Sequence, residues 1–150
     1  MQSTGIEIVD VDENLIDEIW DKVKESPSFE SIGDGCSRAQ VHKVYFESNL
    51  VIRANGSYAR FEVNDSYVEI HVMIFKHSFF RDAKENLRSL YAFAHKSFQN
   101  RPIRCMIPNE MRGFKRLAEI AGMRALGLVS RNLSGVPITC AVFEWRPEYV

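Results

Sequence analysis

A change of hydrophobic period near residue 80 is the feature that most restricts how this chain can fold. Before it, three strand-like segments follow one another at Asn49–Ala54, Ser57–Val63 and Tyr67–Phe75. The first turn between them is Asn55-Gly56, the dipeptide most typical of a two-residue β-hairpin, and the second is Asn64-Asp65-Ser66. We therefore predict an antiparallel three-stranded meander in the middle of the chain.

After the meander the apolar residues recur at helical spacing. From Asp82 to Phe98 they form one stripe, made of Leu87, Leu90, Tyr91, Ala94 and Phe98. A short buried strand is expected at Pro102–Ile107, and then a second helix with the stripe Met111, Phe114, Leu117, Ala118 and Ala121, ended by Gly122. Because a strand–helix–strand crossover joins parallel strands, we expect one parallel pair inside a mixed sheet.

The two ends of the chain complete the predicted order of elements. An edge strand is expected at Gly5–Val11, followed by a helix with Asn14 as its N-cap, the apolar face Leu15, Ile16, Ile19, Trp20 and Val23, and its end at Pro27. A short helix is expected at Val41–Phe46. Two last strands, Ala125–Arg131 and Ile138–Trp145, flank a turn at Ser134-Gly135. No linker or repeat interrupts the chain, so residues 1–150 are predicted to form a single domain.

The composition excludes several classes of protein. Nineteen basic residues against 20 acidic ones give a net charge of −1, and no basic stripe appears, so we expect no nucleic-acid partner. No apolar run approaches the ~20 residues of a membrane span, and the first residues are acidic, so we expect a cytoplasmic protein without a membrane partner. The cysteines, Cys36, Cys105 and Cys140, lack metal-ligand spacing and are predicted to be free thiols.

Two stretches of the sequence, in this order of elements, resemble the GNAT acetyltransferase superfamily, in particular its phage-encoded type. Tyr67–Phe98 is similar to the family's strand, phosphate loop and helix, and Ile107–Met123 to its next strand and helix. The resemblance implies a mixed α/β fold, in which an antiparallel meander continues into a βαβ crossover with one parallel, splayed strand pair. The two central strands are then expected to separate after Val72.

The resemblance also implies a cofactor and the residues that bind it. GNAT enzymes transfer an acyl group from an acyl-CoA, here expected to be acetyl-CoA, to an amine. One strand offers backbone groups to the pantetheine arm, and a helix N-terminus binds the pyrophosphate because its N–H groups are unpaired. Carried across to this chain, the cofactor-binding residues are Val72, Met73 and Ile74 on the strand and Arg81, Asp82, Ala83 and Lys84 in the loop Phe80 to Lys84.

Glu69 and His71 are the candidates for general-base catalysis. They alternate along one strand and therefore point to the same face, where they could deprotonate the incoming amine if that face lines the gap. The alternative is a polar strand face exposed to water, or a histidine held by hydrogen bonds. No third ligand is identifiable nearby, so no metal site is predicted.

Two positions depart from the family pattern. Asp82 replaces a usual glycine, and as a predicted helix N-cap it would occupy the N–H groups that a phosphate needs. Ala118 stands where many members have a tyrosine acid; of the possible substitutes Tyr67 and Tyr91, Tyr91 is expected in the core. These departures favour an alternative function, in which a catalytically degenerate phage protein acts as a head-assembly or interaction module, associates with the virion and has phage structural proteins as partners.

Overall fold

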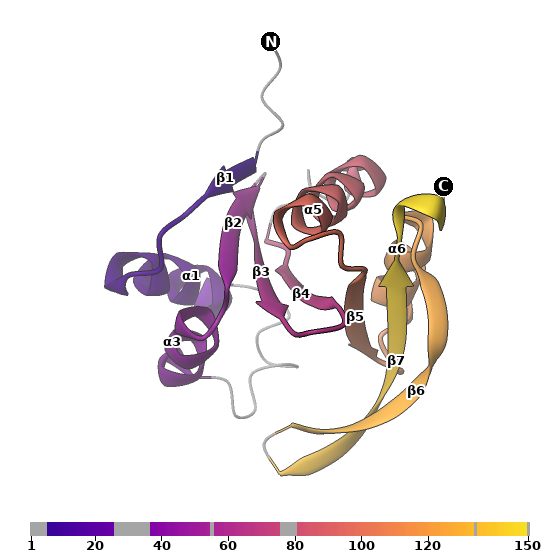
Figure 1. Ribbon diagram of the computed structural model, residues 1–150. Coiled ribbons are helices and arrows are strands. Elements are labelled where there is room, and N and C mark those ends of the chain that lie inside the picture. Colours follow the sequence, from indigo (N-terminus) through magenta and orange to yellow (C-terminus); the bar gives the residue numbers. More distant parts are fainter. Residues whose placement is uncertain (1–5, 26–36, 55, 76–80, 134, 150) are drawn as a thin grey trace.

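A mixed β-sheet with helices on both faces forms the framework of the protein (Figure 1). The computed structural model describes residues 6–25, 37–54, 56–75, 81–133 and 135–149. Their strands are β1 (Ile6–Ile8), β2 (Leu50–Ala54), β3 (Ser57–Val63), β4 (Val68–Met73), β5 (Ile103–Pro108), β6 (Arg124–Leu133) and β7 (Val136–Trp145), in the spatial order β1-β2-β3-β4-β5-β7-β6. Their helices are α1 (Glu13–Glu25), α3 (Arg38–Phe46), α5 (Ala83–Ser97) and α6 (Arg112–Ile120), with a 3₁₀ turn at Pro147–Tyr149.

The antiparallel meander is confirmed. The pair Ala54↔Ser57 closes the β2–β3 hairpin around a two-residue loop in which Gly56 has a φ of 73°. The β3–β4 hairpin closes at Val63↔Val68, where the side-chain oxygen of Asn64 accepts hydrogen bonds from two backbone N–H groups of the turn at 2.9 Å. The turn residues thus fix the register of all three strands.

The crossover and the splayed parallel pair are also confirmed. Helix α5 connects β4 to β5, which pair in parallel at only two positions, Val68↔Ile103 and Glu69↔Arg104. Beyond them β4 stays with β3, whereas β5 stays with β7 along its whole length. The separation therefore begins after Glu69, earlier than expected, and the mixed fold class is that predicted.

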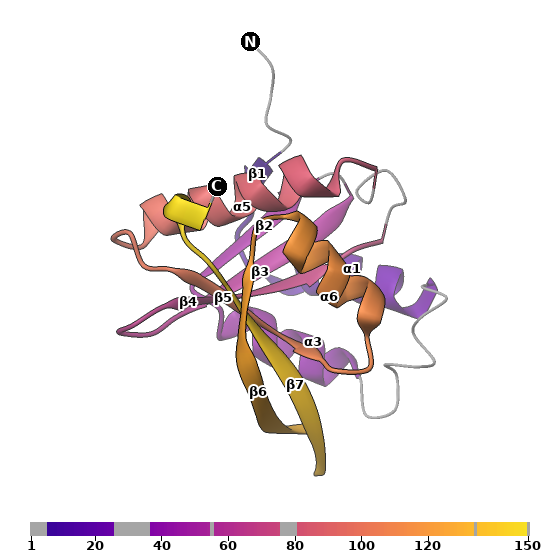
Figure 2. The same cartoon turned by 90° about the vertical axis from the view of Figure 1, so that its right-hand side faces the viewer.

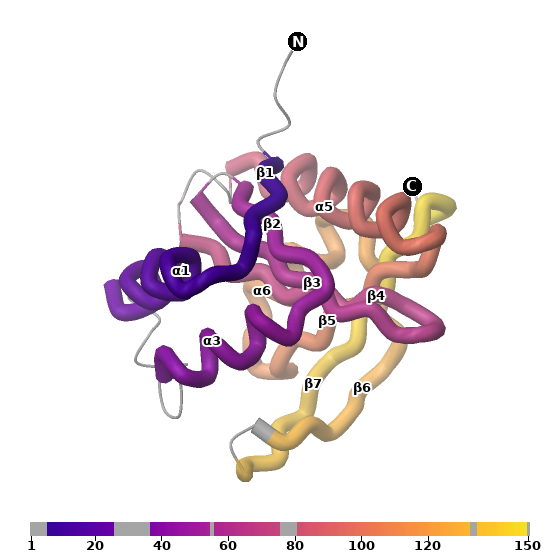
Figure 3. The backbone as a smooth tube through the Cα atoms, turned by 60° about the vertical axis from the view of Figure 1, so that its left-hand side comes forward, coloured from indigo at the N-terminus to yellow at the C-terminus, as the bar shows by residue number. Residues whose placement is uncertain are grey.

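Two hydrophobic cores lie on opposite faces of the sheet. The larger is buried under α5 and α6 and takes Phe61 and Ile70 from the strands, while the smaller is buried under α1 and α3 and takes Val51 and Tyr58. Figures 1 and 3 show α1 and α3 side by side on their face, away from α5 and α6. Because strand side chains alternate, every second residue of β3 and β4 points toward the α1–α3 face.

Helix N-termini were the least accurate part of the sequence prediction. Asn14 is not the N-cap of α1; the helix begins at Glu13, because the Asp12 carboxylate accepts a hydrogen bond from the Leu15 N–H at 2.8 Å. Helix α3 begins three residues earlier than expected, since Ser37 and Gln40 form a reciprocal capping box with both hydrogen bonds at 3.2 Å. The expected end of α1 at Pro27 lies outside the described residues.

The end of α6 follows the prediction. Gly122, with a φ of 96°, donates to the Glu119 carbonyl, and the next N–H, of Met123, donates to the Ala118 carbonyl, both at 3.0 Å. This pattern is a Schellman motif, in which glycine supplies the left-handed conformation. The last two strands are longer than predicted, and β1 is shorter.

The described cysteines are free, as predicted. Cys140 is buried, and burial raises the pKa of the Cys105 thiol to about 12. Cys36 lies outside the described residues. Among the helices that the structure describes, none combines the length and the hydropathy that would let it cross a membrane.

Phe61→Ala should lower the free energy of unfolding by about 3–5 kcal/mol, because the Phe61 side chain is fully buried between the central strand and α5. Urea denaturation followed by circular dichroism measures the change. Phe114→Ala, at a side chain that is 39% exposed, is the matched control and should cost far less. Equal losses in the two variants would contradict the assigned core.

Candidate active site

The separation of β4 from β5 leaves one edge of β4 without a strand partner. The Val68 N–H donates to the Pro102 carbonyl on the β5 side at 2.9 Å, so strand alternation directs the backbone groups of Ile70 and Val72 to that same edge. In the described part of the chain, β5 offers them no partner. Of the three residues predicted to bind pantetheine, Val72 presents its backbone to the gap, Met73 pairs with Tyr58 of β3, and Ile74 follows the end of β4.

Asp82 does not cap the N-terminus of α5, so the prediction that it does is wrong. The Asp82 carboxylate makes no capping hydrogen bond, and its backbone, at φ −113° and ψ 30°, is outside the extended conformation that a capping side chain needs. Arg81, Asp82 and Lys84 are exposed and Ala83 is buried. Residues 76–80, which include Phe80 of the predicted loop, lie outside the described residues.

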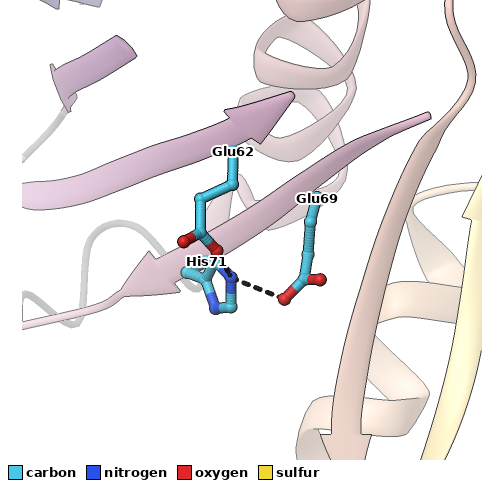
Figure 4. A group of neighbouring side chains, drawn as sticks. All are labelled: Glu62, Glu69 and His71. Atoms are coloured by element: carbon cyan, nitrogen blue, oxygen red, sulfur yellow. Dashed lines mark hydrogen bonds and ion pairs between the residues drawn. The ribbon is translucent and has the colours of Figure 1, made fainter. Parts of the chain in front are cut away.

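Glu69 and His71 share one face of β4, as their spacing requires, and this is the α1–α3 face. His71 Nε2 lies 2.7 Å from Glu69 Oε2 and 3.1 Å from Glu62 Oε2 (Figure 4). Glu62 comes from β3, where it is the direct partner of Glu69 in the ladder. Two carboxylates from neighbouring strands therefore converge on one imidazole nitrogen.

This arrangement determines the tautomer of His71. Ionised carboxylates only accept hydrogen bonds, so the Nε2 atom that faces both of them carries the proton. In the neutral imidazole the lone pair is then on Nδ1, for which the described residues provide no hydrogen-bond partner. His71 Nδ1 is thus the proton acceptor of the cluster.

Glu69 is held in its ionised form. Its side chain is buried, and burial, the largest influence, raises its pKa, but the hydrogen bonds and charges of His71 and Arg131 outweigh it and hold the pKa of Glu69 below its ordinary value. Arg131 Nη1 lies 3.1 Å from Glu69 Oε2. A carboxylate held in its ionised form orients and polarises the imidazole and accepts protons poorly.

An open cleft of about 460 Å³ lies beside this cluster. It is lined by Arg60, Glu62, His71, Met106, Pro108, Arg131, Asn132 and Cys140. The last three come from the β6–β7 hairpin, which bends across this side of the sheet in Figure 1 and extends past its edge in Figure 2. The cleft thus joins residues of the central strands β3 to β5 with residues of the β6–β7 hairpin.

The three charged residues of this cleft, Arg60, Glu62 and Arg131, were missed by the sequence analysis. Glu62 could have been found, because the turn at residues 64–66 sets the register that places it opposite Glu69. Arg60, the ladder partner of His71, follows from the same register. Arg131 could not have been found, since it reaches Glu69 only through the bend of the terminal hairpin.

Glu62 also supplies the third metal-type ligand that the sequence analysis did not identify. One ligand atom each from Glu62, Glu69 and His71 lie within 4.8 Å of one another. Two guanidinium groups already compensate the carboxylates, however, with Arg131 at 3.1 Å from Glu69 and Arg60 at 3.5 Å from Glu62. The expected absence of a metal stays a prediction.

The two tyrosines considered as substitutes for the missing acid lie in different surroundings. Tyr91 belongs to the core under α5, with its ring centroid 5.9 Å from that of Trp145, and burial raises its pKa well above the ordinary value. The prediction that Tyr91 lies in the core is confirmed. The other substitute, Tyr67, stacks on the guanidinium of Arg104, whose carbon lies 4.4 Å from the ring centroid.

The free energy of unfolding should decrease as the pH is lowered, because Glu69 becomes protonated. Its folded pKa is lower than its unfolded pKa, so the stabilisation is fully present above the unfolded value and is lost as the pH falls through the folded value. Urea midpoints between about pH 6 and pH 3 should decrease less for Glu69→Gln than for the wild type. The exposed Glu110→Gln is the control, and an unchanged pH dependence in Glu69→Gln would contradict the assignment.

Comparisons with known proteins address the whole architecture. No protein-family model matches the chain, and no curated protein matches it. Solved structures do match over nearly the full length: a putative ribosomal-protein-serine acetyltransferase from Vibrio cholerae (TM-score 0.73, 14% identity, 97% of this chain and 96% of the other) and RimL, an alpha-N-protein acetyltransferase in complex with coenzyme A (0.71, 11%, 99% and 97%).

A third match is an acetyltransferase of the GNAT family from Bacillus anthracis (TM-score 0.69, 16% identity, 96% of each chain). At these identities the likeness concerns the fold, and nothing in it supports a phage origin or a role in head assembly. The seven-stranded sheet, the helices on its two faces and the one short parallel pair agree with these structures. The chain therefore has the fold of the GNAT acetyltransferases.

Proposed function

We propose that this protein binds an acyl-CoA, with acetyl-CoA as the expected donor, and transfers its acyl group to an amine. The observation that carries the proposal is the position of the base. The β4–β5 ladder ends at Glu69↔Arg104, and the Glu69–His71 pair lies directly at the start of the opening. An open strand edge and a general base are thus combined at one point of the sheet.

The open edge of β4 and the start of α5 suit an acyl-CoA donor. The backbone groups of Ile70 and Val72 can pair with the amides of a pantetheine arm, as an added strand would. Arg81 and Lys84 supply positive charge at the start of α5, whose first N–H groups and dipole favour a pyrophosphate. Asp82 opposes binding by its charge but leaves these N–H groups free of a side-chain cap.

His71 is the proposed general base. When bound, the acyl-CoA supplies an activated thioester carbon. The attacking amine must lose a proton, and His71 Nδ1 takes it, because Nε2 is held as a donor to Glu62 and Glu69. Glu69 stabilises the imidazolium that results, as the orienting carboxylate does in other base–carboxylate pairs. A thiolate leaves readily without an acid, so the absence of a tyrosine at Ala118 does not prevent transfer.

The comparisons supply a second, independent support. RimL was solved with coenzyme A bound, which agrees with a CoA donor for this fold. The alternative of a degenerate interaction module loses its main argument, because it depended on Asp82 closing the mouth of α5. The alanine at position 118 and the charge of Asp82 are the observations that still favour it.

Titration calorimetry with coenzyme A tests the binding step. Arg81→Ala should weaken binding by about 5- to 30-fold, the loss of one charge-assisted contact. Asp82→Asn should strengthen it by about 2- to 5-fold, because it removes a negative charge next to the pyrophosphate. Arg38→Ala, on the α1–α3 surface where Arg38 pairs with Glu13, should change nothing. Wild-type affinity weaker than millimolar, or no effect of Arg81→Ala, would remove the proposal.

His71→Gln should lower turnover by about 10²- to 10⁴-fold and leave coenzyme A affinity unchanged, since the base acts on the amine and lies on the opposite face of the sheet from α5. Release of free thiol from acetyl-CoA, measured over a panel of amines, gives the rate. His42→Gln is the matched control, because His42 contacts Glu13 on the α1–α3 surface. Full activity in His71→Gln would reject this histidine as the base.

A further inference from the structure

We infer that the acyl acceptor is a free α-amino acid with an apolar side chain, whose carboxylate is bound by Arg60. The inference depends on the proposed transfer to an amine and names the class of that amine. It follows from the polar groups of the cleft, from their spacing and from their charges.

Arg60 carries a buried hydrogen-bond donor that has no acceptor among the described residues. Its side chain is only 13% exposed, and its Nη1 atom is buried without a hydrogen-bond partner among the described residues. The nearest carboxylate oxygen, of Glu62, is 3.5 Å away, and the guanidinium carbon lies 5.9 Å from the ring centroid of Tyr45. A buried donor without an acceptor is costly, and because Arg60 also lines the cleft, a carboxylate bound there would meet its guanidinium group.

The distance between Arg60 and the base limits the size of that ligand. Arg60 and His71 are direct partners in the β3–β4 ladder, so their Cα atoms are about 5 Å apart and their side chains are neighbours on the same face. An amine at His71 Nδ1 and an oxyanion at Arg60 must then be separated by few bonds. An α-amino acid meets this condition, because it carries both groups on one carbon.

The charges of the cleft favour a zwitterion. Arg60 and Arg131 balance Glu62 and Glu69, so with a neutral His71 the cluster has no net charge. A polyamine would bring several positive charges next to two guanidinium groups. A zwitterion instead adds its carboxylate to the unsatisfied arginine and its amine to the base, and the site stays neutral.

The rest of the cleft accommodates the side chain of the acceptor. Met106, Pro108 and Cys140 line it opposite the charged residues, and its volume of about 460 Å³ holds one amino acid. Because these three lining residues are apolar, a methionine or leucine side chain suits them better than a charged one.

The experiment compares methionine with methioninamide, which keeps the amine and the side chain but lacks the carboxylate. Wild-type kcat/KM should be about 10- to 100-fold higher for methionine, the effect of a charge-assisted contact. Arg60→Gln should bring the ratio close to one by lowering kcat/KM for methionine alone, and Arg60→Lys should restore part of it. Arg38→Gln is the control and should keep the wild-type ratio. Thermal melting verifies that each variant is folded.

The outcomes separate this inference from the function on which it rests. Turnover of methioninamide, of a peptide N-terminus or of spermidine equal to or above that of methionine would overturn the inference and leave the acyltransferase intact. A wild-type preference for methionine that survives in folded Arg60→Gln would overturn the role of Arg60. If coenzyme A does not bind at all, the proposed function itself fails, and the calorimetric titration reports this before any acceptor is tested.

Discussion

The structure depends on how strand β5 pairs with its two neighbours in the sheet. A parallel partner, β4, and an antiparallel partner, β7, both lie beside it, and β7 pairs with it at six consecutive positions whereas β4 pairs at two. Antiparallel pairing is the more stable per residue, and β7 pairs with β5 along its whole length. Strand β5 therefore follows β7, and β4 is left with an open edge after Glu69.

This divergence gives the two faces of the sheet different chemistry at the same place. The backbone groups of Ile70 and Val72 point to the open edge of β4, and α5, the next described helix, begins after Asp82, which does not cap it, beside the exposed Arg81 and Lys84. On the α1–α3 side, the next residues of the same strand, Glu69 and His71, are held in an ion-pair cluster. Alternate residues of β4 therefore have different roles. Ile70 and Val72 present backbone groups at the open edge, and Glu69 and His71 present side chains on the α1–α3 face.

The charged cluster is stable in a partly buried position because its charges compensate one another. Glu69 is buried, which on its own would favour the protonated acid, but His71 and Arg131 restore the ionised form. Glu144, its neighbour across β5, is stabilised in the same way by Arg104 and Arg146 at 2.8 and 2.7 Å. Arg60 differs, because its buried Nη1 atom makes no hydrogen bond with the described residues and only a long ion pair with Glu62 at 3.5 Å.

The sequence by itself determined the elements and their pairing wherever local chemistry decides them. The turn residues at 55–56 and 64–66 set the meander, Gly122 ended α6, and the change of period at residue 82 required a crossover. It did not determine that Asp82 fails to cap α5, since capping needs an extended backbone at that residue and its φ of −113° and ψ of 30° are a property of the folded chain. Nor could it place Arg131 beside Glu69, 62 residues away in sequence. That contact depends on the bend of the β6–β7 hairpin, which only the packing of the whole sheet decides.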